Sequence, residues 1–266
     1  MAKRKKKGER LYGQPGAQVG RAEEPGPLAA GSLLEGVKSL ALAFCLFLAL
    51  RSFVIQNFVI TSGSMEETLL VGDFLMVNRL ALGSRIPFTT KSIPGYSEPR
   101  RNDVIVFDPT HVDDLKLVKR LIGMPGDTVS MTDRILTVNG QVIDEPYVHH
   151  QELPDEGPSV PNDGITHIPD RAYMEWQRAY LAPGVDREAY RPTRDNWGPL
   201  VIPEGRYFML GDNRETSLDS RYWGLLERYR LEGRAVFIYF SYNRDSPRPF
   251  AFLREIRWNR FGHGIH

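Results

Sequence analysis

An apolar run near the start of the sequence restricts the fold more than any other feature of the 266 residues. The run is unbroken from Leu40 to Leu50 and reaches Leu33 if Glu35 and Lys38 are accepted within it. That length suits one membrane-spanning helix, and Lys38 can extend its amine toward the headgroups. No small-x-small cleavage site follows the run. It therefore predicts an uncleaved transmembrane anchor helix over residues 33–52.

The residues before this run predict its orientation. Glu9 is the only acid among the first ten residues, which hold six bases: Lys3, Arg4, Lys5, Lys6, Lys7 and Arg10. By the positive-inside rule, residues 1–32 form a basic cytoplasmic tail and everything after Arg51 crosses the lipid bilayer. The alternative is a soluble protein with a buried apolar helix, because the unbroken core of the run is short.

Composition excludes several kinds of site. The chain is 41% hydrophobic and 25% charged, which is ordinary for a globular protein. The net charge of +1 includes the basic tail, so the remaining body is slightly acidic and is not expected to bind nucleic acid. Cys45 is the only cysteine, which excludes an internal disulfide and a thiolate metal site.

Beyond the anchor, the sequence changes to short segments of β-branched and aromatic residues bounded by Gly, Pro, Asn or Asp. Asn139-Gly140 is a strong signal for a two-residue hairpin. We therefore expect a mainly β fold with an antiparallel sheet. The segments are Asp73 to Leu80, Asp103 to Phe107, Leu115 to Gly123, Thr128 to Val142, Arg206 to Leu210 and Arg234 to Tyr242.

Residues 145–200 interrupt this series of strand-like segments and are rich in Pro, Gly and Asp. They predict an inserted subdomain that divides the β domain into two parts, 53–144 and 201–266. One helix is expected from Asp170 to Leu181, with Tyr173, Trp176 and Tyr180 on a shared face. We expect this aromatic face to pack the insert onto the sheet rather than to contact the membrane.

Two serines lie close after the apolar run, in the stretch ITSGSMEETL that begins at Ile60. A serine nucleophile needs a base within hydrogen-bond reach, and the six histidines stand in turn-like, Pro-rich or terminal contexts. A buried lysine is another base, because burial disfavours the charged form of an amine whose pKa is about 10.4 in water. A strand over residues 115–122 would place Lys119 on one face with Leu115, Leu117 and Leu121. The alternative is that Lys119 extends into solvent from an edge strand.

Four segments in this order resemble the bacterial type I signal peptidases, over most of the chain from the anchor to Arg257. The segments are Ser62-Gly-Ser-Met65 with Thr68-Leu69, Lys119-Arg120 with Gly123-Met-Pro-Gly-Asp127, Gly211-Asp-Asn-Arg214 through Trp223-Gly224, and Gly233-Arg-Ala235. Each is weak alone, but together they are specific. The resemblance implies a membrane-anchored serine endopeptidase of the bacterial inner membrane with its catalytic β domain on the periplasmic face. Its partners would be exported precursor proteins and the bilayer, without a metal or an organic cofactor.

The resemblance also implies roles for individual residues. Ser64 is the expected nucleophile and Lys119 its base; Ser62 and the Ser64 amide would donate hydrogen bonds to the oxyanion. Ser217 would hold the Lys119 amine, and Asp219 would pair with Arg221 to brace that support. Small residues are expected at the cleavage site (an Ala-X-Ala pattern), because the expected substrate-binding residues are bulky and apolar. These residues are Phe58, Ile60, Met65, Leu117 and Val118.

Two residues depart from the family pattern near the nucleophile. Glu67 and Thr61 stand where the family commonly has proline, which bears on the shape of the turn and of the substrate pocket. Asp212 and Asn213 are expected to close a turn rather than to act chemically. Two alternative functions remain at this point: a membrane-tethered β domain that only binds extended peptides, and a Ser/Lys peptidase with one dedicated substrate.

Overall fold

The computed structural model describes residues 30–53, 55–85, 92–110, 115–148, 150 and 174–266. The chain divides into two compact units, residues 1–45 and residues 46–266. Helix α1 (Ala30–Phe53) covers the range expected for the anchor. No helix in the described part of the chain has the length and apolar character needed to cross a membrane. Most of the expected basic tail lies outside the described residues.

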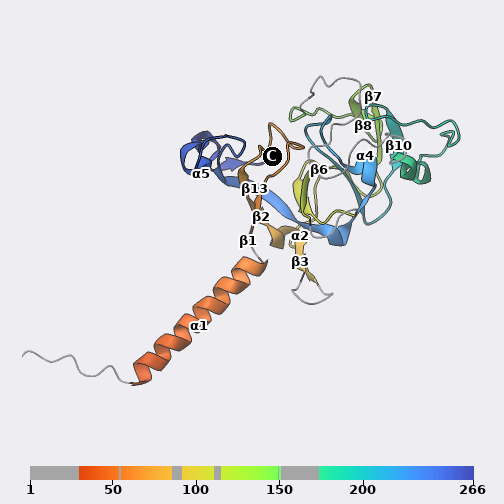
Figure 1. Cartoon of the computed structure of the whole chain (residues 1–266). Coiled ribbons are helices and arrows are strands. Elements are labelled where there is room, and N and C mark those ends of the chain that lie inside the picture. The colour runs from red at the N-terminus through yellow and green to blue at the C-terminus, as the bar shows by residue number, and fades with distance from the viewer. Residues whose placement is uncertain (1–29, 54, 86–91, 111–114, 149, 151–173) are drawn as a thin grey trace, which may run out of the picture. The chain divides into compact units, whose positions relative to one another are not determined.

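The second unit is mainly β, as predicted. Its largest sheet has eight strands, all paired antiparallel, in the order β1-β2-β13-β5-β6-β11-β12, with β14 paired to β13 (Figure 1). Strand β13 pairs with both β2 and β5, so it joins the early strands to the centre of the sheet. These strands are β1 (Ile55–Val59), β2 (Asp73–Asn78), β5 (Val104–Phe107), β6 (Leu117–Gly123), β11 (Arg206–Leu210), β12 (Leu226–Glu227), β13 (Leu231–Ser241) and β14 (His263–Gly264).

Two smaller sheets complete the β structure. The four-stranded sheet has the order β10-β7-β8-β9, and β3 pairs with β4. Strand β10 belongs to the range expected as an insert, and it pairs with β7 of the preceding segment. The strands are β3 (Gly83–Arg85), β4 (Ser92–Pro94), β7 (Thr128–Thr132), β8 (Ile135–Val138), β9 (Gln141–Val142) and β10 (Trp197–Val201).

Helices in the second unit are short. They are α2 (Arg79–Leu82), α4 (Ser220–Trp223), α5 (Ala251–Arg254) and the 3₁₀ turns η1 (Glu175–Tyr180), η2 (Arg228–Arg230) and η3 (Trp258–Arg260). The helix expected from Asp170 to Leu181 is thus a shorter 3₁₀ turn in its described part, while residues 170–173, including Tyr173, lie outside the described residues. The ring centroids of Trp176 and Tyr180 are 5.7 Å apart. Both side chains pack against the buried cluster of the four-stranded sheet, as expected.

One predicted strand ends earlier than expected. The prediction extended the strand from Asp73 to Leu80, but β2 stops at Asn78 and α2 begins at the next residue. The Asn78 side chain accepts a hydrogen bond from the Ala81 amide at 3.1 Å. A side-chain oxygen that satisfies a free amide in this way caps a helix N-terminus, which explains the change.

The predicted hairpin at Asn139-Gly140 is confirmed. Val138 and Gln141 face each other across it, and both turn residues have positive φ, at 52° and 77°. Two positive φ angles are the requirement of a type I′ turn, which Asn-Gly satisfies with little strain. The Asn139 side chain adds two hydrogen bonds, from the Thr128 amide and to the Asp127 carboxylate.

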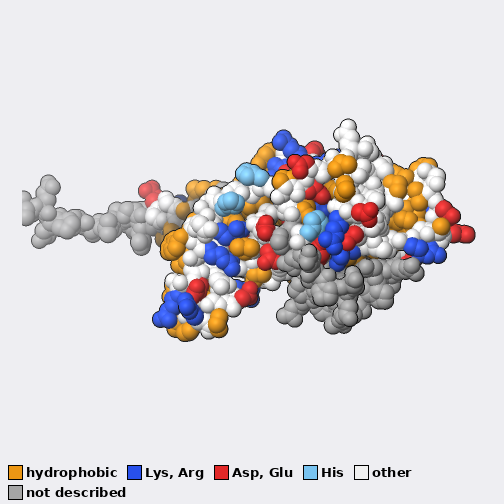
Figure 2. All heavy atoms as spheres, turned by 90° about the horizontal axis from the view of Figure 1, so that it is seen from above, with side chains coloured by type: hydrophobic (Ala, Val, Ile, Leu, Met, Phe, Trp, Pro, Cys, Tyr) orange, Lys and Arg blue, Asp and Glu red, His pale blue; other side chains and the backbone are white. Residues whose placement is uncertain are grey.

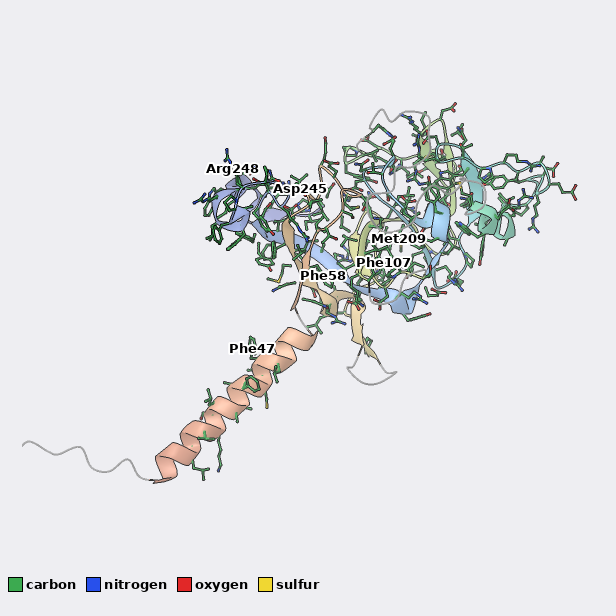
Figure 3. All side chains as sticks on the ribbon, viewed as in Figure 1. Phe47, Phe58, Phe107, Met209, Asp245 and Arg248 are labelled. Carbon is green, nitrogen blue, oxygen red and sulfur yellow. The ribbon has the colours of Figure 1, made fainter. Side chains whose placement is uncertain are left out.

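Three buried apolar clusters hold the second unit together. One joins the four-stranded sheet to β11, one joins β2, β5 and β13, and the third lies among α2, β5, β6 and β11. Phe107 and Met209, of the third cluster, lie close together, and Phe58 packs against the second cluster (Figure 3). Figure 2 shows basic and acidic side chains interspersed on one face of the molecule.

Candidate active site

Ser64 and Lys119 meet in the interior of the second unit. Ser64 lies in the turn between β1 and β2, and Lys119 is the third residue of β6. The Lys119 Nζ atom is 2.5 Å from Ser64 Oγ, and the two residues are only 3% and 6% exposed. An amine in hydrogen-bond contact with a hydroxyl can take its proton if the amine is neutral.

The sheet explains why Lys119 is buried. Strand β6 lies between β5 and β11 rather than at an edge, and Lys119 faces Ile105 across the β5 pairing. Leu121, two residues after Lys119, belongs to the third cluster, and Leu117, two residues before it, packs against that cluster. The alternative of a lysine reaching solvent from an edge strand is therefore wrong, because the side chain is enclosed on a central strand.

Ser62 lies beside the nucleophile candidate. Its Oγ atom is 3.4 Å from Ser64 Oγ, and its side chain is partly buried. The Ser64 carbonyl accepts a hydrogen bond from the Asn213 amide at 3.2 Å, which ties the serine turn to the loop after β11. The two serines thus share one corner of the site with that loop.

Gly211 allows this close approach. A Cβ atom at this position would lie 2.1 Å from Ser217 Oγ and 2.5 Å from the Ser64 carbonyl oxygen, both far inside contact distance. Ser217 is fully buried, and its hydroxyl is among the groups that lower the pKa of Asp219. Only glycine fits between the serine turn and Ser217.

Asp219 and Arg221 form a buried, two-pronged ion pair. Arg221 Nε and Nη2 each donate to Asp219 at 2.8 Å, and both side chains are fully buried. The Gly211 amide donates to the same carboxylate at 3.1 Å. Burial alone would raise the pKa of Asp219, but the charge and hydrogen bonds of Arg221 and the Gly211 amide lower it below its usual value. The pair therefore stays ionised and anchors the 211–221 loop.

Four of the five expected substrate-binding residues come together. Ile60 and Met65 are buried in the second cluster, and Phe58 and Val118 pack against it. Leu117 packs against the third cluster instead. Neighbouring residues of a strand point to opposite faces, so Leu117 and Val118 cannot line the same pocket wall.

A second buried ion pair next to Lys119 was not predicted from the sequence. Arg120 Nε and Nη2 donate to Asp212 at 2.8 and 2.7 Å, and both side chains are about 1% exposed. Thr68 Oγ1 donates to the same carboxylate at 2.6 Å. Asp212 therefore does more than close a turn, because it connects β6 to the turn that carries Ser64. In the sequence, the only indication of this ion pair was the position of Arg120 directly after Lys119.

Two further contacts, both partly buried, lie in the same loop. Arg214 Nη2 donates to Glu145 at 2.5 Å, and His150 Nδ1 lies 2.9 Å from the buried Glu215 carboxylate. Among the described residues, no group of three or more His, Cys, Asp or Glu side chains could hold a metal ion.

The turn after Ser64 has a backbone conformation at Glu67 that proline cannot adopt. Glu67 has a φ of 73°, in the left-handed region, whereas the proline ring holds φ near −65°. The residue that replaces the family's usual proline thus adopts a conformation closed to proline. Thr61, the other departure, is exposed.

The sequence matches a known protein family over most of its length. The family described as "Signal peptidase, peptidase S26" matches residues 33–240. Signal peptidase I of Pseudomonas aeruginosa is 34% identical over 241 residues, covering 84% of this chain and 80% of the relative. Signal peptidase I of Bacillus licheniformis is 31% identical, covering 80% of this chain and 91% of the relative.

A crystal structure of a signal peptidase I from Enterococcus faecalis V583 is 29% identical and covers 52% of this chain and 97% of that chain. Its TM-score of 0.32 is too low to support a shared fold. The family match extends over most of the chain, and its residues 33–240 include the serine turn and the lysine strand. The chain therefore belongs to the signal peptidase family, peptidase S26, and is a serine peptidase.

Proposed function

We propose that this protein removes signal peptides from exported precursor proteins, with Ser64 as the nucleophile and Lys119 as its base. The observation that carries the proposal is the 2.5 Å contact between Lys119 Nζ and Ser64 Oγ, with both residues buried. Burial disfavours an ammonium ion, so the enclosure of Lys119 supports a neutral amine that can accept a proton. The membership of the signal peptidase family supports the substrate class.

The proposed reaction has two halves. Lys119 takes the Ser64 proton while Ser64 Oγ attacks the scissile carbonyl carbon, and the Ser64 amide and Ser62 hydroxyl donate to the oxyanion. Lys119 then returns the proton to the leaving amine, which frees the mature protein and leaves an ester on Ser64. In the second half, Lys119 accepts a proton from water, the resulting attack releases the signal peptide, and Ser64 regains its proton. Ser217 is proposed to orient the amine, and the Asp219–Arg221 pair to brace Ser217.

The open edge of the large sheet supports the mode of substrate binding. Strand β1 ends the strand order and pairs with β2 alone among the described strands. An extended precursor segment can add to such an edge, beside residues 58–62. Every second side chain of the segment would then face the protein. Bulky apolar side chains from the second cluster fill this region, including Ile60 and Met65. Small residues at the cleavage site and two positions before it therefore fit best.

We also propose that α1 is a single-pass anchor in the bacterial inner membrane, with residues 1–32 cytoplasmic and the catalytic β domain periplasmic. The apolar run within α1 and the basic residues before it support this arrangement. The division into a β domain of two parts, 53–144 and 201–266, with residues 145–200 inserted, is part of the same proposal.

The test is cleavage of a synthetic signal-peptide substrate by the detergent-solubilised protein. Ser64→Ala and Lys119→Met should each abolish cleavage, with a loss of at least about a thousandfold. Ser130→Ala and Lys116→Met are matched controls away from the site and should remain active. Leu at either small position of the substrate should lower turnover more than about tenfold. Cleavage by Ser64→Ala at the parental rate would refute the proposed nucleophile.

A further inference from the structure

Residues 262–266, which we call the 262–266 segment, end in contact with the residue next to Lys119. Arg120 Nη1 donates to the His266 carbonyl oxygen at 2.8 Å and to the Asn102 carbonyl at 2.9 Å. Asp212 accepts hydrogen bonds from the rest of the guanidinium. The Arg120 Cζ atom lies 3.7 Å from the centre of the Tyr147 ring. Arg120 is thus a buried junction of four separate parts of the chain.

The 262–266 segment is itself fixed to the large sheet. His263 and Gly264 form β14 and pair with β13, and the Ile265 amide donates to the Val236 carbonyl at 2.9 Å. The Ile265 side chain is buried in the second cluster, which also contains Met65 and Leu69 of the serine turn. The backbone oxygen of His266 therefore reaches Arg120 from a segment that is fixed to the large sheet.

Arg120 connects this segment to both members of the proposed dyad. It follows Lys119 directly in β6, and through Asp212 it reaches Thr68 of the serine turn. Its Nη2 atom also lies 3.4 Å from Thr68 Oγ1. The residue after Asp212 donates its amide to the Ser64 carbonyl. A shift of the guanidinium would therefore change the placement of the serine turn relative to β6.

We propose that the 262–266 segment positions Ser64 against Lys119 by holding Arg120 through the His266 carbonyl oxygen. This inference rests on the proposed function for its effect on turnover, but not for its effect on the serine turn. Without the His266 backbone oxygen, Arg120 Nη1 donates only to the Asn102 carbonyl, so the guanidinium is held by one hydrogen bond fewer. His266 is thus a positioning residue that acts through its backbone rather than its side chain.

Two variants separate the backbone from the side chain. A chain that stops at Ile265 loses the oxygen that Arg120 uses but keeps the buried Ile265 side chain. His266→Ala loses the imidazole and keeps the carbonyl oxygen. We expect the shortened chain to lose about tenfold in kcat with KM changed less than about twofold, because misplaced reacting groups lower turnover rather than binding. His266→Ala should match the parent.

Hydrogen exchange gives a readout that does not depend on activity. The amides of Glu66 and Leu69 donate within the serine turn, to Gly63 and Met65. In the shortened chain, peptides covering residues 62–69 should exchange about tenfold faster than in the parent or in His266→Ala. Arg120→Lys should cause a similar change, and the shortened chain should add little to it, because coupled groups are not additive.

Each result decides one question. Parental exchange at residues 62–69 in the shortened chain would overturn the inference, and so would equal effects of His266→Ala and of the shortened chain. Additive effects of Arg120→Lys and the shortening would also overturn it, since they would show that the segment does not act through Arg120. A parent that fails to cleave the signal-peptide substrate would count against the proposed function alone, because the exchange experiment would still decide this inference.

Discussion

A buried lysine beside a serine should affect stability as well as activity. If Lys119 is neutral when folded, the unfolded chain binds one more proton up to about pH 10. That difference lowers the free energy of unfolding at neutral pH, and Lys119→Met removes it while preserving the length of the side chain. We expect Lys119→Met to be inactive yet more stable than the parent at pH 7 by roughly 1–3 kcal/mol, with the gain shrinking toward pH 10. Chemical denaturation at several pH values measures this.

Two controls make the stability result specific. Ser64→Ala should be equally inactive without a pH-dependent gain. Lys116→Met removes a partly exposed amine that pairs with Asp108 and Glu232, and it should not be stabilising. If Lys119→Met is no more stable than the parent at pH 7, the amine is charged when folded, and Lys119 does not act as the base.

Glu67 offers a second prediction at the scale of one residue. Its φ of 73° is accessible to asparagine at small cost but not to proline. Glu67→Pro, which restores the usual residue of the family, should therefore lower stability by about 2 kcal/mol or more and reduce cleavage. Glu67→Asn should keep both near the parental level. Thermal unfolding and cleavage rates distinguish the two, and a Glu67→Pro protein as stable as the parent would show that the turn can adopt another shape.

The sequence predicted some residues of the site well and could not predict others. The leucines two residues from Lys119 on either side indicated an enclosed face of a strand, but an edge strand with Lys119 in solvent fitted the pattern equally well, and the structure decided between the two. The burial of Arg120 on the other face gave no such signal, because an arginine between Lys119 and Leu121 looks equally suited to solvent. Its partner Asp212 lies 92 residues away, and spacing alone does not predict a pair at that separation.

At the scale of elements, the start of α4 yields a prediction about pH. Asp219 caps this helix by accepting from the Arg221 amide at 3.2 Å, and it pairs with the Arg221 side chain. Burial on its own raises the pKa of Asp219, but Arg221 and the Gly211 amide bring it below the usual 3.8. The carboxylate therefore contributes stability that is fully present above about pH 3.8 and is lost as the pH falls through the lowered folded value.

Asp219→Asn tests that sign. The variant leaves a buried guanidinium without its counter-charge, so it should be less stable than the parent by about 3 kcal/mol at pH 7. The difference should begin to narrow below about pH 3.8, where the Asp219 carboxylate of the unfolded parent takes up a proton, and should narrow further until the folded carboxylate is protonated at its lowered pKa. Asp186→Asn changes an exposed carboxylate and serves as the control. A stability difference that stays constant from pH 7 to pH 3 would contradict the role assigned to the charge.

The sequence predicted an element boundary where the backbone conformation at that boundary suits few residue types. The Asn139-Gly140 turn was predictable because two adjacent positive φ angles favour few residue pairs. The end of β2 at Asn78 was not, since Leu80 is apolar like the residues before Asn78 and only the capping bond to Ala81 starts the helix. The pairing of β13 with β2 and β5 joins segments more than a hundred residues apart, which periodicity does not reveal.

At the scale of the whole molecule, the proposed anchor and the site are close in sequence. Only ten residues separate the end of α1 at Phe53 from Ser64, and five of them form β1. So short a connection limits how far Ser64 can lie from the end of the helix, because an extended chain spans at most about 3.6 Å per residue.

Topology tests this arrangement in cells. Six basic residues before the apolar run should keep the tail cytoplasmic, so a reporter fused after His266 should be active only outside the cytoplasm. Protease added to intact spheroplasts should digest the β domain and spare a fragment of about 50 residues, the length of the tail plus one span. Replacing the six bases by glutamine should weaken this orientation, whereas replacing Arg244, Arg248 and Arg254, which lie after the anchor, should leave it unchanged. Protection of the whole chain from protease would mean that the β domain is cytoplasmic, and release of the intact protein from membranes by carbonate would mean that α1 is not an anchor.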